Sequence, residues 1–112
     1  MITPEECKKL KSIAFNTALL ESLTEQEKII YDRILLYISD KIEEFVSDIN
    51  KTTIYLEKGK IVPYTLNRES DMRIMWLRDY TLSEYGWEIT QPPYSIQLTP
   101  IKGFNEHIPK KL

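Results

Sequence analysis

The chain begins with a long stretch that lacks the two residues that most readily end helices. Residues 5–58 of the 112 contain neither glycine nor proline, and both residues are unfavourable in helix interiors. The sequence TPEE at residues 3–6 supplies a capping threonine, a proline at the first helical position and a glutamate three residues after the cap. Because this combination marks a helix start, we predict a first helix from about Pro4 to Ser22.

The sequence TEQE at residues 24–27 repeats this capping pattern directly afterwards. It predicts a second, longer helix that ends between Asp48 and Lys51. Two helices joined by so short a connection typically pack as an antiparallel hairpin. The second helix also carries apolar residues at alternating spacings of four and three, a seam that needs a partner helix. The seam consists of Tyr31, Leu35, Ile38, Ile42, Phe45 and Ile49. We expect it to face the first helix.

After this helical hairpin the sequence becomes typical of strands. Residues 52–55 favour β structure, and Lys58-Gly59 has the composition of a turn that leads into residues 60–62. We predict a β-hairpin here, whose second strand lies at an edge or ends at Pro63, because proline cannot donate a ladder hydrogen bond.

A third helix is expected over residues 67–85. Asn67 or Ser70 is a suitable N-terminal cap, and Gly86 is placed to end the helix in a left-handed conformation. Apolar and polar residues then alternate over 87–91 and again over 94–99, which predicts a second β-hairpin with one buried face.

The predicted fold class is therefore α+β, in a single domain of residues 1–112. Residues 1–50 form an antiparallel helical hairpin, and residues 51–99 form a β-hairpin, a helix and a second β-hairpin that together build a small antiparallel sheet. Residues 100–112 have no sustained periodicity, so we expect an extended tail. The sequence leaves open whether all four strands share one sheet.

Composition narrows the class of protein. Fifteen basic and seventeen acidic residues give a net charge of -2, which does not favour a nucleic-acid partner. The first residues have no leader-like pattern, and no apolar stretch approaches the length of a membrane span. A single cysteine excludes an intrachain disulfide. We expect a soluble protein of the cytoplasm or of a virion, with no signal peptide and no membrane contact.

The chemistry-bearing residues do not form a catalytic set. His107 is the only histidine and Cys7 the only cysteine, so neither a histidine-based triad with independent support nor a histidine-rich metal site can be built; we expect Cys7 to pack. A carboxylate cluster on the second helix is expected to be a solvated face. Its members are Asp40, Glu43, Glu44 and Asp48. The prediction is a protein that is not an enzyme, with no cofactor, metal or small-molecule substrate.

Surplus apolar surface indicates protein partners instead. Ile29 and Leu36 fall on the side of the second helix opposite its seam, and Ile30 and Tyr37 lie next to them. One interpretation is that the rest of the chain covers these residues. The other is that this surface meets another subunit, because exposed apolar patches mark interaction sites.

The tail supplies a second predicted contact. Four apolar residues are spread along it among turn and charged residues, and such a segment cannot form a core of its own. These residues are Ile101, Phe104, Ile108 and Leu112. We expect the tail to dock on a neighbour or to wrap over the second hairpin, with Phe104 as its main anchor.

The function predicted from these observations is structural: an assembly subunit that works through contacts with other protein subunits. Fifteen isoleucines against two alanines resemble the composition encoded by AT-rich genomes, which suggests a small component of a virus or tailed-phage particle. Two alternatives stay open. One is a small inhibitor or regulator that binds one host protein, and the other is a single-stranded nucleic-acid binder that stacks bases on Trp76, Trp87 and tyrosines.

Overall fold

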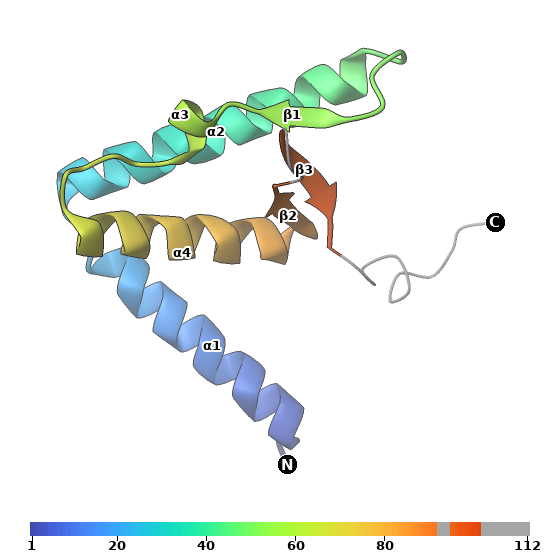
Figure 1. The fold of residues 1–112 in the computed structure, drawn as a ribbon. Helices are drawn as coiled ribbons and strands as arrows, with labels where there is room; N and C mark the ends of the chain where they lie inside the picture. Colours follow the sequence, from blue (N-terminus) through green and yellow to red (C-terminus); the bar gives the residue numbers. More distant parts are fainter. Residues whose placement is uncertain (92–94, 102–112) are drawn as a thin grey trace.

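The computed structural model describes residues 1–91 and 95–101. Within these residues it contains four helices and three strands (Figure 1). In chain order they are α1 (Pro4–Glu21), α2 (Glu25–Ser47), β1 (Ile54–Leu56), α3 (Lys58–Ile61), α4 (Arg68–Glu84), β2 (Trp87–Thr90) and β3 (Ile96–Pro100). The α+β class predicted from the sequence is confirmed.

Helices α2 and α4 pack against each other at the centre of the molecule, and the sheet lies against one end of this pair (Figure 1). β1 lies against α2, whereas β2 lies against α4, after which it begins directly. The buried apolar side chains come from α2, α4, the strands and the segments beside them, so one core serves the whole α2–β3 region. The core consists of Leu23, Tyr31, Ile34, Ile38, Ile54, Leu56, Ile61, Ile74, Leu77, Leu82 and Leu98.

The sheet has the strand order β1-β3-β2, with both pairings antiparallel. Leu98 of β3 lies opposite Ile54 of β1 on one side and Ile89 of β2 on the other. Since residues aligned across neighbouring strands point to the same face, this row presents apolar side chains to the helices. Tyr55, one position along β1, is exposed on the other face.

The helix starts lie where the capping patterns place them. Thr3 accepts a hydrogen bond from the Glu6 backbone N–H, and Thr24 forms a complete capping box with Glu27. Asn67 caps α4 through the N–H groups of the next turn. After α4, Gly86 has φ 84°, a left-handed conformation that glycine adopts without steric cost.

The first predicted β-hairpin is wrong in its second strand. Residues 58–61 form the short helix α3, and β1 pairs with β3, more than forty positions along the chain. Ile54 and Leu56 are both buried while Tyr55 is exposed, so the alternation in β1 matches the apolar row of β3. Tertiary burial therefore selected the distant strand over the local turn. The sheet accordingly has three strands among the described residues.

The predicted antiparallel packing of the first two helices is also wrong. α1 contacts α4 and extends away from the rest of the molecule (Figure 1). The seam of α2 from Tyr31 to Phe45 faces α4 and the sheet instead: Tyr31 Oη lies 2.6 Å from Thr81 Oγ1 of α4, and Ile38 is in the central core. Ile49, the last predicted member of the seam, lies after the end of α2 and is 94% exposed, so its inclusion was wrong. A short connection permits a hairpin but does not impose one, because the apolar faces of α4 and of the sheet compete for the same seam.

Candidate interaction surfaces

Of the single cysteine and the single histidine that carried the sequence-based argument about chemistry, the first is exposed and the second lies outside the described part of the chain. They include no group of three or more His, Cys, Asp or Glu side chains that could hold a metal ion. Across the same residues, every buried side-chain nitrogen or oxygen has a hydrogen-bond partner. Cys7 is exposed on α1, so the expectation that it packs is wrong, because α1 has nothing over its first turns. His107 lies outside the described residues.

Of the four residues predicted to form a surface on the back of α2, two are exposed and two are half-buried. Ile29 and Leu36 are 63% and 64% exposed, so they do form an apolar surface opposite the seam. Ile30 and Tyr37 are half-buried against the core, and the Tyr37 hydroxyl accepts a hydrogen bond from the Glu57 backbone N–H at 3.0 Å. The free part of this surface is therefore limited to the first pair.

The predicted tail contact can be followed only at its beginning. Ile101 is half-buried, and its backbone N–H donates to the carbonyl of Gly86 at 3.0 Å. This bond extends the pairing of β3 with the start of β2 by one residue. Phe104, Ile108 and Leu112 lie outside the described residues, so their docking stays a prediction.

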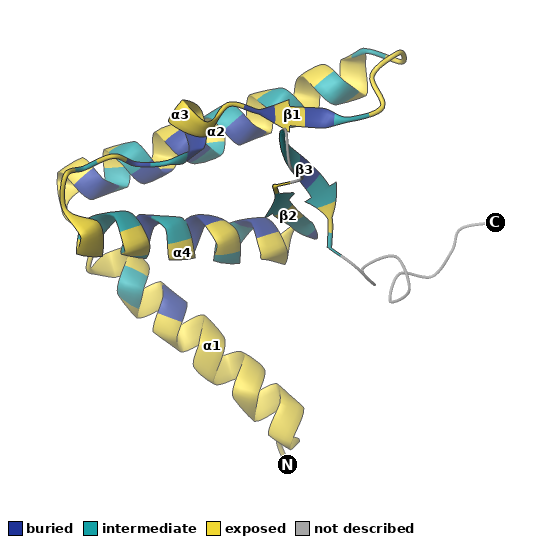
Figure 2. Ribbon diagram, viewed as in Figure 1, coloured by how far each residue is buried: buried dark blue, intermediate teal, exposed yellow. Residues whose placement is uncertain are grey.

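Helix α1 exposes most of its surface (Figure 2). Of its 18 residues only Asn16 is buried, while Leu10 and Phe15 are 53% and 59% exposed and Ile13 and Leu20 are exposed as well. A soluble helix usually buries an apolar stripe. This surface was not anticipated from the sequence, although the recurrence of apolar residues at positions 10, 13 and 20 could have indicated it.

A small polar contact holds the C-terminal half of α1 on α4. The Asn16 side-chain amide donates to the Ser12 carbonyl at 2.7 Å and accepts from Trp76 Nε1 at 2.7 Å. Phe15 meets the Trp76 ring edge to face, with ring centroids 6.4 Å apart. Because Trp76 is itself more than half exposed, this contact fixes the direction of α1 without burying much apolar area.

The start of α2 is bound to α4 by an ion pair between the buried Glu27 and the half-buried Arg73. Arg73 Nη2 lies 2.8 Å from Glu27 Oε2, and Glu27 is 5% exposed. The Thr24 backbone N–H, which donates to Glu27, is the main cause that lowers the pKa of Glu27 from 4.5 to about 2. Burial opposes this shift, whereas hydrogen bonds from Ser70, Arg73 and the Thr24 hydroxyl add to it.

An apolar groove lies between α2 and α4, near the point where α4 meets β2. Its lining residues are Leu35, Ile38, Ser39, Ile42, Thr81, Leu82, Tyr85 and Trp87. Tyr85 is 75% exposed. Val46, one helical turn beyond Ile42, is 73% exposed. The groove therefore continues into an exposed apolar surface rather than closing over the core.

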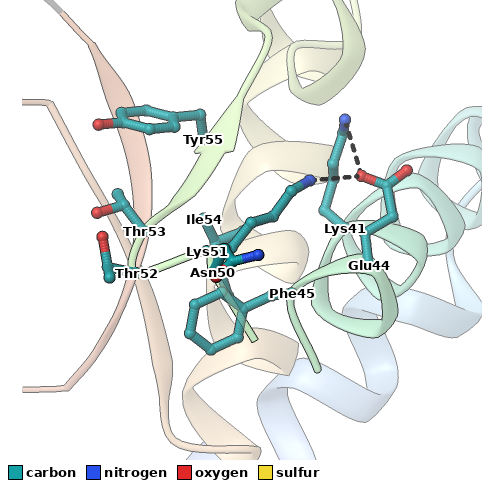
Figure 3. A pocket seen from close by; sticks show the side chains of 9 residues that line it. All are labelled: Lys41, Glu44, Phe45, Asn50, Lys51, Thr52, Thr53, Ile54 and Tyr55. Atoms are coloured by element: carbon teal, nitrogen blue, oxygen red, sulfur yellow. Dashed lines mark hydrogen bonds and ion pairs between the residues drawn. The ribbon is translucent and has the colours of Figure 1, made fainter. Parts of the chain in front are cut away.

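Two hollows on other faces are more polar. In the first, between α2 and β1, Lys41 and Lys51 both approach Glu44 Oε2, at 3.4 and 3.7 Å (Figure 3). Glu44 and Lys51 are exposed and Lys41 is half-buried, and ion pairs at such a surface contribute little to stability. The second hollow lies between α4 and β2, beside Arg78. The buried guanidinium of Arg78 donates to the Ile61 carbonyl at 2.7 Å and to Asp79 at 2.9 Å. The first of these bonds ties α4 to α3.

The loop before α4 displays two further apolar side chains. Tyr64 and Leu66 have φ of 51° and 67°, conformations that cost non-glycine residues free energy, and both side chains are exposed. The Thr65 backbone N–H between them donates to Asp71 Oδ1 at 2.9 Å. This bond to α4 holds the loop in its shape. No sequence pattern indicated the loop as a surface.

Comparisons with family models, curated proteins and solved structures find no match for this chain. Among the described residues, no helix has both the length and the apolar character needed to cross a membrane.

Proposed function

We propose that this chain is a non-enzymatic assembly subunit that works through contacts with other protein subunits. The observation that carries the proposal is α1, an 18-residue helix with one buried residue and an exposed apolar side. Most of the stability of a helix in a protein comes from packing of its amphipathic face against other elements rather than from its intrinsic propensity. The apolar side chains of α1 gain free energy only when another surface covers them.

The contact with α4 supports this role, because it points α1 outward rather than folding it away. Asn16 and Phe15, near the C-terminal end of α1, meet Trp76, while the N-terminal half of α1 diverges from α4 (Figure 1), so that an open hollow separates Ile13 from Tyr80 and Glu84. A projecting amphipathic helix that docks in a groove is a common mode of recognition between proteins. The exposed pair Ile29 and Leu36 on α2 supplies a second surface for the same purpose.

The particle to which such a subunit would belong is a finer proposal. The isoleucine-rich composition favours a virus or tailed-phage particle, whereas an inhibitor of one host protein would use the same exposed helix on a single target. A single-stranded nucleic-acid binder is less favoured, because the Trp76 indole already donates to Asn16 and Trp87 is half-buried.

Lysine crosslinking followed by mass spectrometry tests the proposed function in native extract. Lys8, Lys9 and Lys11 are exposed on the projecting half of α1, so they should give crosslinks to another polypeptide, either a second copy or a different protein. Lys58 and Lys60 on α3 are matched controls on another exposed face. If the protein stays monomeric in extract and α1 gives no intermolecular crosslinks, the proposal is wrong.

A further inference from the structure

We infer that the C-terminal segment of this chain, residues 102–112, lies in the apolar groove between α2 and α4 of the same molecule and covers it. The inference goes beyond the proposed function, because it concerns a different surface from α1. Contacts with other subunits would then be confined to α1 and to the exposed pair Ile29 and Leu36, while the groove is closed to them.

The last described residue brings the chain to one end of the groove. The Ile101 backbone N–H donates to the Gly86 carbonyl at 3.0 Å. Gly86 lies between Tyr85 and Trp87, and both of these residues line the groove. The C-terminal segment therefore begins beside two of the groove's own residues, and the pairing of β3 with β2 holds it there.

The C-terminal segment is long enough to follow the groove. It has eleven residues, which span about 36 Å in extended form. Along α2, the apolar surface from Leu35 to Val46 measures about 17 Å at 1.5 Å per helical residue. Gly103, two residues after Ile101, supplies the conformational freedom that a turn around the end of α4 requires. Enough chain is then left to cover the groove.

The apolar residues of the C-terminal segment suit an extended chain in such a groove. Phe104, Ile108 and Leu112 are separated by even numbers of residues, so they project to one side of an extended chain. Pro109 is unfavourable in a helix interior. Three large apolar side chains on one side gain free energy when an apolar surface covers them.

The groove offers more apolar surface than the other hollow that Ile101 reaches. That hollow lies between α4 and β2, and Ile101 is among its lining residues. Most of its other lining residues are polar or charged: Arg78, Asp79, Ser83, Glu88 and Gln91. In the groove, by contrast, only Ser39 and Thr81 are not apolar. Apolar anchors therefore gain more free energy in the groove.

Charge along the groove agrees with this occupant. The exposed Asp32 and Glu43 lie on the groove side of α2, seven residues before and four residues after Ser39. The basic residues of that stretch, Arg33 and Lys41, line hollows on other faces. The C-terminal segment carries three lysines and one glutamate. Opposite charges at the rim favour its approach and orientation.

Disulfide trapping in the full-length protein tests the inference. In a Cys7→Ser background, Glu106→Cys places a thiol between the anchors of the C-terminal segment, and Ser39→Cys places one in the groove; together they are the groove pair. The control pair combines Glu106→Cys with Glu44→Cys. Glu44 is exposed, lies about 140° around α2 from Ser39, and lines the hollow beside β1.

With oxidised glutathione and micromolar protein, the groove pair should form an intramolecular disulfide about 10-fold faster than the control pair, because docking raises the effective concentration of one thiol at the other. Electrophoresis without reducing agent separates this product from a covalent dimer. The helix substitutions are at exposed positions, so circular dichroism of the reduced variants should show the helix content of wild type.

Removal of the anchors gives the most specific result. In the groove-pair protein, Phe104→Ala/Ile108→Ala should slow disulfide formation to the rate of the control pair, because it removes the apolar contact. Asn105→Ala/His107→Ala changes the alternate positions, which project to the other side of an extended chain. This matched variant should leave the rate unchanged.

Several results would overturn the inference. It is wrong if the groove pair and the control pair oxidise at equal rates, or if the anchor variant keeps the rate of the groove pair. It is also wrong if the product is a covalent dimer whose yield falls on dilution, because the C-terminal segment would then occupy a second copy. None of these results involves α1, so the lysine crosslinks of α1 judge the proposed function separately.

Discussion

Helices α1 and α2 begin with closely related capping sequences but differ in how much they bury. Thr3 and Thr24 each accept a hydrogen bond from a backbone N–H three residues later. α2 then buries Glu27, Tyr31, Ile34 and Ile38, whereas α1 buries only Asn16. A capping sequence satisfies the first N–H groups of a helix, so it fixes where the helix starts. Whether the helix packs depends on which other elements lie beside it.

The side chains themselves do not account for this difference. Ile13 on α1 and Ile38 on α2 are chemically identical, yet Ile38 lies in the central core and Ile13 is exposed. α2 lies against α4 and β1, which together cover its seam, while α1 contacts α4 near one end. Apolar residues in a helix therefore predict a need for burial but do not specify the partner.

The most direct test of the different burial of α1 and α2 is to place the same charged residue on each helix. Ile38→Asp should lower the free energy of unfolding by about 4 kcal/mol, because it buries an unpaired carboxylate. Ile13→Asp should change it by less than about 0.5 kcal/mol when the protein is dilute enough to be monomeric. Urea unfolding followed by circular dichroism measures both. Equal losses at the two positions would contradict the different burial of α1 and α2.

Acid sensitivity should distinguish the two capping sequences next. Because the pKa of Glu27 is lowered from 4.5 to about 2, its stabilising contribution is full above pH 4.5 and is lost as the pH falls toward 2, by on the order of 2 kcal/mol. Glu27→Gln should be less stable at neutral pH and should lose less stability on acidification. Glu6→Gln, at the equivalent position of α1, is the control. Parallel acid curves for Glu27→Gln and wild type would refute this role.

The smallest expected effect concerns the contact between α1 and α4. Asn16→Ala removes the acceptor of the Trp76 indole N–H and should cost about 1 kcal/mol. Hydrogen exchange should then accelerate in α1 more than in α2, since α1 would lose its main attachment. Lys11→Ala, at an exposed site of the same helix, should leave exchange unchanged. Uniform acceleration over both helices would show that α1 does not open independently.

The elements that local signals specify were predicted well. The caps at Thr3, Thr24 and Asn67 and the left-handed Gly86 lie where the sequence places them. The antiparallel pairing of β2 with β3 also follows from the strict alternation of apolar and polar residues before and after Pro92-Pro93. Each of these features depends on hydrogen bonds or backbone conformations within a few residues, so a single sequence contains enough information.

Pairings between distant elements were predicted less well. Ile54 in β1 could have paired with a nearby strand after Gly59, but it pairs with Leu98. Of the predicted interface on α2, Ile29 and Leu36 are exposed while Ile30 and Tyr37 are half-buried. Position around a helix is readable from a sequence, but what covers each side is not, because that depends on where the other elements lie.

By itself, the sequence determined the α+β class, the helix starts and the alternation of the last two strands, because capping, glycine conformation and periodicity act over short distances. Only the tertiary structure decided that α2 packs against α4 and the sheet, leaving α1 exposed. The physical reason is competition for burial: the seam around Ile38 is covered once, and α4 with the three-stranded sheet covers it. The apolar side of α1 is what that competition leaves free.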